Sequence, residues 1–202
     1  MILYPQKNQG FSLVEVLVAI TILLLVIVGP MQIIARSINS TNFATEQVNA
    51  WFLAQEGLEL AQKGRDDLVL QNFKLQINPP GEDTPMSQFL SRYASCIGVN
   101  GACGLNISDG ISEPSVVNCN LVSNCKLYMD TTNVRSSYIH TITAVPSLYT
   151  RVVKMEPTLV GGSGSKVREI KVTSTVTWRT GSLIANQKVE AVTYLFNVYD
   201  TE

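Results

Sequence analysis

An isolated glutamate near the start of a long apolar run is the first side chain whose placement suggests chemistry. From Phe11 to Ala35 the sequence carries no charge except that of Glu15. A carboxylate inside a bilayer costs roughly 2.5–3.5 kcal/mol even on insertion scales, so we expect Glu15 to have a cationic partner. Cleavage between Gly10 and Phe11 would create an α-amino group one helical turn away, on the same chain or on a neighbouring copy.

The apolar run itself is long enough to cross a membrane. A helix over residues 11–35 spans about 37 Å at ~1.5 Å per residue, which exceeds the ~30 Å hydrocarbon core of a bilayer. Gly29 and Pro30 lie inside the run, and because proline removes a backbone hydrogen bond, we expect a kink or an unwound turn there. Lys7 favours a cytoplasmic N-terminus, although Arg36 opposes it. An ordinary signal-anchor helix is the alternative interpretation.

The junction between the polar leader and the apolar run resembles a known processing motif. Gly10-Phe11-Ser12-Leu13-Val14-Glu15-Val16-Leu17 is similar to the motif of type IV prepilins and type II secretion pseudopilins, and the close resemblance extends from Lys7 to about Glu59. It implies that prepilin peptidase cuts after Gly10 and methylates the amine of Phe11. It also implies that Glu15 helps one subunit pack on the next, and that the helix melts near Gly29 and Pro30 as the subunit enters a filament. A static proline kink is the alternative.

The resemblance also implies partners and a location. The expected partners are other pilin subunits, prepilin peptidase, membrane lipid before assembly, and the pilus assembly platform. The expected location is the inner membrane, with a single pass and the C-terminal domain outside the cytoplasm, and then an extracellular or periplasmic filament. The stretch from Leu53 to Glu59 resembles a minor-pilin branch of the family. A type II secretion pseudopilin remains an alternative.

The predicted fold is α+β and pilin-like, and its parts follow one another along the chain. A long N-terminal helix packs on a C-terminal antiparallel sheet beside a disulfide-stapled loop region. The expected parts are a leader over 1–10, the membrane and filament-core half of the helix over 11–35, its amphipathic half over 36–64, a loop-rich, cysteine-containing segment over 65–125, and an antiparallel sheet over 126–202.

Several details of the head follow from local patterns. The apolar stripe of Val48, Trp51 and Phe52 is predicted to face the sheet, and Gly64 is predicted to cap the helix. Alternating β-branched residues and turn signals favour strands. The predicted strands are 126–130, 138–145, 148–156, 167–179 and 187–199, and the short helices are 65–73 and 86–94.

Four cysteines lie in the C-terminal part of the chain, where an outward-facing domain would be oxidised. Four cysteines allow three pairings, and the sequence does not choose between them. We favour Cys96 with Cys103 and Cys119 with Cys125, because each pair closes a short loop that contains turn residues. Zinc is the rival interpretation, but these gaps are wider than the spacing usual in structural zinc sites.

The charge balance argues against a general nucleic-acid binder, and the remaining polar residues argue against an enzyme. With 15 basic and 16 acidic residues the chain lacks the basic excess of a general nucleic-acid binder. His140, the only histidine, is expected on a strand without a catalytic partner. We predict no cofactor, metal or catalytic site. Three alternatives stay open: calcium at Asp66 and Asp67 or at Glu82 and Asp83, a membrane-anchored enzyme, and a filament-tip adhesin or DNA-uptake module with a basic surface. That surface would comprise Lys154, Lys166, Arg168 and Lys171.

Overall fold

The computed structural model describes most of the chain. The described residues are 10, 12–75, 84–98, 100–107, 113–119, 125–131, 137–142, 145–160, 166–180 and 186–197. Phe11, Glu82 and Asp83, all singled out above, lie outside them, as do residues 161–165. By its internal contacts the chain divides into two units, Met1–Thr45 and Glu46–Glu202, and each is described by itself. We call the second unit the head.

The long helix α1 (Leu13–Leu75) is helical throughout and includes Pro30 in its interior. The residues on both sides of Gly29 and Pro30 are therefore helical in the single chain. The melting implied by the family resemblance stays a prediction. The predicted C-cap at Gly64 and the separate helix over 65–73 are wrong, because α1 continues through both to Leu75.

The described residues of the head form one seven-stranded sheet. β5 (Val145–Val160) pairs with β6 (Lys166–Trp178), which in turn pairs with β7 (Gln187–Phe196), and all these pairings are antiparallel. On its other side β5 pairs with β3 (Lys126–Asp130) and, at Val153, with β1 (Cys103–Asn106). β4 (Ser137–Ile139) extends the sheet from β3, and β2 (Ser115–Asn118) extends it from β1. The predicted antiparallel sheet is confirmed.

The boundaries of several predicted elements differ in the structure. The strand predicted over 138–145 is wrong, since β4 ends at Ile139 and β5 begins at Val145. The loop-rich segment holds β1 and β2, which the sequence did not predict, together with α2 (Pro85–Arg92) and the short 3-10 helix η1 (Ala94–Cys96). α2 confirms a short helix there, and its N-terminus is capped by Thr84, whose hydroxyl accepts from the Ser87 amide at 3.2 Å.

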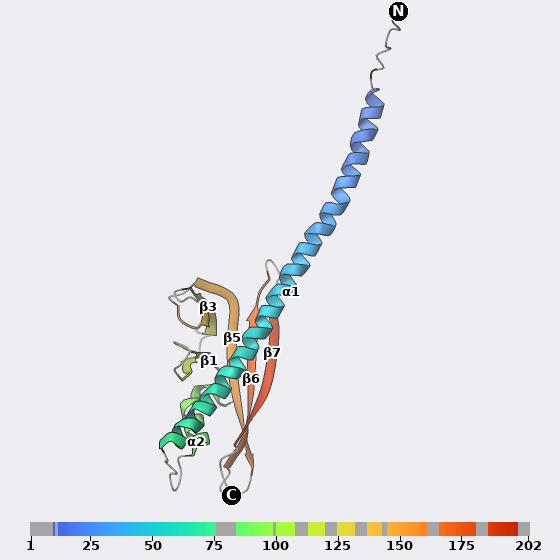
Figure 1. The fold of residues 1–202 in the computed structure, drawn as a ribbon. Coiled ribbons are helices and arrows are strands. Elements are labelled where there is room, and N and C mark those ends of the chain that lie inside the picture. The colour runs from blue at the N-terminus through green and yellow to red at the C-terminus, as the bar shows by residue number, and fades with distance from the viewer. Residues whose placement is uncertain are drawn as a thin grey trace, which may run out of the picture. The chain divides into compact units, whose positions relative to one another are not determined.

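The head part of α1 packs on β5, β6 and β7 (Figure 1) through small residues rather than through its aromatic stripe. Val48, Trp51 and Phe52 are exposed, so the predicted contact face is wrong. The face toward the core repeats at helical spacing and is dominated by alanine, glycine and leucine. Its buried residues are Ala50, Leu53, Ala54, Gly57, Leu60, Ala61, Gly64 and Leu68.

Two glycines on this face bring α1 unusually near its neighbours. A Cβ atom at Gly57 would overlap the Ser174 hydroxyl of β6, and one at Gly64 would overlap the ring and hydroxyl of Tyr93. Tyr93 is buried and stacks beside Phe89 of α2, with 4.4 Å between ring centroids. Glycine costs a helix about 1 kcal/mol relative to alanine, so its presence here reflects packing rather than a helix end.

A buried arginine joins this helix to the sheet. Arg151 of β5 has 0% of its side chain exposed, and its Nη1 donates to Glu56 Oε2 at 2.6 Å and to the Leu53 carbonyl at 3.3 Å. Its Nη2 donates to the Leu105 carbonyl of β1 at 2.9 Å. Burial lowers the pKa of Arg151, and the Glu56 carboxylate opposes that shift. Glu56 is itself 40% exposed, so its carboxylate reaches the buried guanidinium from the edge of the core.

Removing the acid should leave the buried cation without its charge partner. We expect Glu56→Gln to lower the free energy of unfolding by about 2 kcal/mol, less than the ~3–5 kcal/mol for breaking a fully buried pair, because Glu56 is partly exposed. In an Arg151→Met background the same substitution should cost little. Chemical denaturation of the four full-length chains in detergent measures this coupling.

Glu59→Gln is the matched control, since Glu59 is an exposed acid on the same helix. It should change stability by no more than about 0.5 kcal/mol. Equal losses for Glu56→Gln with and without Arg151 would show that the pair does not hold the helix to the sheet.

Candidate processing and assembly site

The N-terminal segment places its single acid at the start of a helix. Gly10 is exposed, and helical hydrogen bonding begins where the Val16 amide donates to the Ser12 carbonyl at 3.2 Å. Glu15 lies in the first turn of α1 and is exposed. The unpaired amides of a helix N-terminus carry partial positive charge, which favours a carboxylate in the first turn. The described part of the chain holds no ion pair for Glu15.

The apolar segment that follows is exposed on all sides within the single chain. Its best 18-residue window has a mean hydropathy of 2.7 and none of it is buried, so α1 is long and apolar enough to cross a membrane. The hydroxyl of Thr21 donates to the Val18 carbonyl at 2.8 Å, which satisfies its donor inside the helix. The segment therefore presents apolar side chains and no unsatisfied hydroxyl donor at Thr21 to lipid or to another helix. These features indicate a single membrane-anchoring helix.

The cysteines lie in two pairs in the loop-rich part of the head. Cys96 of η1 is joined to Cys103 of β1 with 4.8 Å between their Cα atoms, and Cys119 is joined to Cys125 with 5.4 Å between theirs. These are the two short-loop pairs favoured from the sequence. The first ties η1 to the sheet within the main core, and the second joins the end of β2 to the start of β3.

His140 occupies a different place from the one expected. It follows β4 instead of lying in a strand, and it is 5% exposed. Its backbone amide donates to Asn106 Oδ1 at 2.8 Å, and its ring packs against Gly104, where a Cβ would overlap it. Neither ring nitrogen has a hydrogen-bond partner. Burial first, and then the positive charge of Arg151, lower the pKa of His140 from 6.5 to about 4.

The polar groups considered as ligand sites are engaged in local pairs. Lys63 Nζ lies 2.5 Å from Asp67 Oδ2, and Arg65 Nε lies 2.7 Å from Asp66 Oδ1, so both acids already have cations beside them. Within the described ranges, no three His, Cys, Asp or Glu side chains gather as a metal site would require.

One residue of the proposed basic surface, Lys171, is paired with an acid. Lys171 Nζ lies 3.3 Å from Glu156 Oε2, and the register shift between β5 and β6 falls beside Arg168. Lys154 is exposed, and the side chain of Lys166 lies outside the described structure. Paired charges of this kind weaken the long-range field that attracts a polyanion.

The sequence missed Arg151 and its role. It lies two residues from Tyr149 and from Val153, and both are buried, so period-two alternation would have placed it on the inner face of β5. No local signal points to Glu56 as its partner, since 95 residues separate the two.

Comparison with known protein families finds a match at the N-terminus. Residues 5–29 match the family model described as the prokaryotic N-terminal methylation motif. No match was found among curated proteins or among solved structures. The matched residues contain Gly10, Phe11 and Glu15 and most of the apolar run.

The buried imidazole should make the head sensitive to acid. The unfolded chain binds a proton at His140 near pH 6.5, whereas the folded chain resists protonation until about pH 4. Stability is therefore lost as pH falls through this window. The loss from His140 should approach about 3 kcal/mol, at 1.36 kcal/mol per pKa unit. Denaturant unfolding of the full chain at pH 7, 5.5 and 4 measures it.

His140→Gln provides the comparison, because the amide does not titrate in this range. Carboxylates elsewhere titrate alike in both chains, so the difference between the two pH profiles isolates the imidazole. Parallel profiles for the wild type and His140→Gln would contradict the assignment.

Proposed function

We propose that this chain, which carries the N-terminal methylation motif of the type IV pilin and pseudopilin family, is a structural and minor subunit of a type IV pilus-like filament. The observation that carries the proposal is the junction of Gly10 and Phe11 with an apolar helix whose only acid is Glu15. The helix anchors the subunit in the inner membrane, with the head outside the cytoplasm. From there the subunit enters a periplasmic or extracellular filament.

The chemistry of assembly follows from the charge on the helix. Prepilin peptidase cleaves after Gly10 and methylates the amine of Phe11, and the amine remains cationic. The Glu15 carboxylate then has a partner about one turn away, on its own chain or on a neighbour. Lipid tails are about as apolar as aliphatic side chains, so apolar helices gain little free energy by replacing lipid contacts with helix contacts. Polar pairing and close packing therefore decide association. The acid therefore favours a neighbour that brings an N-terminal amine.

Two features support the minor-subunit part of the proposal. The stretch from Leu53 to Glu59 resembles a minor-pilin branch, and the head carries two disulfide-linked cysteine pairs in an elaborated segment between helix and main sheet. A type II secretion pseudopilus uses the same helix and the same processing, so it remains the alternative filament for this subunit.

Processing should depend on the glycine before the cut. We expect the native protein to begin at N-methylated Phe11 in cells with prepilin peptidase and at Met1 in cells without it. Gly10→Val should leave the precursor uncut in both, because a branched side chain replaces the hydrogen of glycine at the scissile bond. Intact mass and the mass of the N-terminal peptide distinguish these species.

Gly29→Val is the matched control, since the same change lies inside the apolar run and away from the junction. Its product should begin at Phe11 like the wild type. A chain beginning at Met1 regardless of the peptidase would reject the pathway and leave a signal-anchored head.

Assembly should depend on the acid. We expect Glu15→Val to be processed normally and retained in the membrane, but to enter filaments about tenfold less, which corresponds to 1.4 kcal/mol of lost pairing. The ratio of this subunit in sheared filaments to that in membranes measures incorporation.

Thr21→Val is the control, because it removes another polar group from the same segment whose hydroxyl bonds only within its own helix. It should assemble normally. Normal incorporation of Glu15→Val would remove the proposed role of the acid while leaving the processing result intact.

A further inference from the structure

The strand β7 presents a free edge beside an apolar groove. β7 pairs with β6 over its whole length without a register shift, and within the described structure it pairs with no other strand. A row of unpaired amides and carbonyls is a template for another extended chain. β7 carries no proline or bulge that would block such pairing.

The backbone groups at this edge can be identified from one hydrogen bond. The Asn197 amide donates to the Arg168 carbonyl at 2.9 Å, so odd-numbered residues of this strand direct their amides and carbonyls toward β6. The even-numbered residues therefore direct theirs to the free edge. At the far end, Arg65 Nη1 donates to the Phe196 carbonyl at 3.3 Å and closes the edge. The open window comprises Lys188, Glu190, Val192 and Tyr194.

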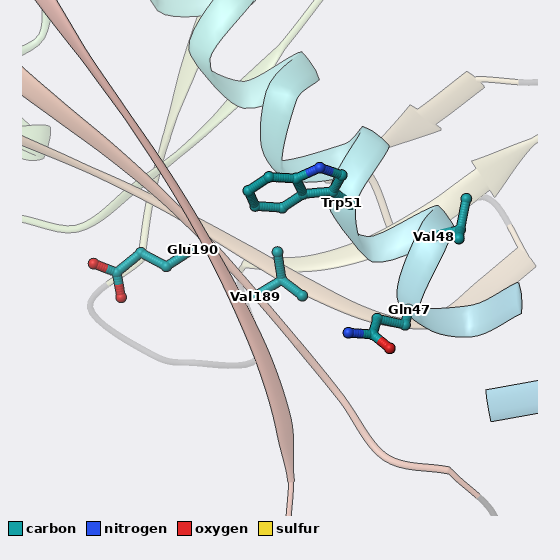
Figure 2. Close-up of a pocket in the computed structure, with 5 residues that line it drawn as sticks. All are labelled: Gln47, Val48, Trp51, Val189 and Glu190. Carbon is teal, nitrogen blue, oxygen red and sulfur yellow. The ribbon is translucent and has the colours of Figure 1, made fainter. Parts of the chain in front are cut away.

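Apolar side chains flank the window on both sides. On the inner side a groove of about 450 Å³ is lined by Gln47, Val48 and Trp51 of α1 and by Val189 and Glu190 of β7. Figure 2 shows Trp51 above Val189, with Glu190 directed to the other side of the strand. On the outer side Val192 and Tyr194 are 44% and 50% exposed. An added strand would thus meet apolar surface with alternate side chains on each face.

We propose that this window is a strand-addition site for a short, uncharged, extended segment of another protein, apolar at alternate positions. The backbone groups at strand spacing require an extended chain, since a helix satisfies its own amides. Lys188 Nζ lies 2.5 Å from Glu190 Oε2, so the window carries no net charge to attract a charged peptide.

The exposed area favours a short segment over a permanent interface. At roughly 200 Å² per aromatic side chain, the half-exposed Trp51 and Tyr194 present together with the exposed valines, Val48 and Val192, on the order of 300 Å². A standard interface buries ~800 Å² per partner, so the area alone suits a transient contact to which main-chain hydrogen bonds add.

Charge disfavours a second copy of this chain as the occupant. Two antiparallel β7 strands that shared the whole window would pair Glu190 with Val192 of the other copy. The two Glu190 side chains would then be diagonal neighbours, about 7–8 Å apart, where like charges repel.

Hydrogen exchange of the full-length chain in detergent tests the site. The probe is a nine-residue peptide that alternates threonine and valine and carries a neutral polyethylene glycol tail. With saturating peptide, the amides of Glu190, Val192 and Tyr194 should exchange at least about tenfold more slowly. The same peptide with every amide N-methylated has no backbone donor for either of its edges, and it should leave them unchanged.

Val192→Pro and Val192→Ala separate backbone pairing from side-chain contact. Proline removes an amide that points to the edge and leaves the bonds to β6, so it should abolish the protection, while alanine should retain most of it. Unchanged exchange with the peptide, or equal slowing by the N-methylated peptide, would overturn the proposal. So would protection that rises with protein concentration alone, since that would place a second copy at the edge. The result does not depend on processing at Gly10.

Discussion

The missing side chain at Gly57 allows α1 to lie close enough to the sheet for Arg151 to reach it. A Cβ atom there would overlap the Ser174 hydroxyl and would lie 3.2 Å from Cδ of Arg151. With the glycine, the guanidinium contacts the Leu53 carbonyl and the Glu56 carboxylate of the helix and the Leu105 carbonyl of β1. One side chain thus joins helix, central strand and the loop-rich segment, and loss of a partner would destabilise the buried cation.

This close approach explains why the sequence predicted the elements of the head better than their contacts. The long helix, the strands β6 and β7 and the short helix α2 follow from periodicity and turn signals. The contact face of α1 does not follow from them, because its residues are small enough to allow close packing on the sheet and are not the most apolar ones. Trp51 and Phe52 are more apolar than Ala50, Ala54 and Ala61, but they would hold the helix away from β5 and β6. A pattern that weighs only apolar character therefore selects the exposed face.

The loop-rich segment shows a second limit of sequence reasoning. β1 and β2 have four residues each, and β1 meets β5 at a single residue pair, Cys103 with Val153. Strands of that length carry too little alternation to be recognised, and tertiary pairing determines them. The cysteines were informative because each of these two disulfides joins residues that are near in sequence. The ion pair of Arg151 with Glu56 gave no such signal, because its partners are far apart along the chain.

Arg151 and Glu15 place opposite charges in apolar surroundings, and the difference between them separates fold from assembly. The arginine finds its carboxylate and its carbonyls within the head, so its charge is satisfied once the chain folds. The described chain offers the glutamate no cation, and its helix presents apolar side chains around it. A charge in lipid without a partner is costly, and the cost falls when another molecule or a new chain end supplies the cation. We infer that Arg151 specifies one folded head, whereas Glu15 favours a state in which this helix lies beside another subunit.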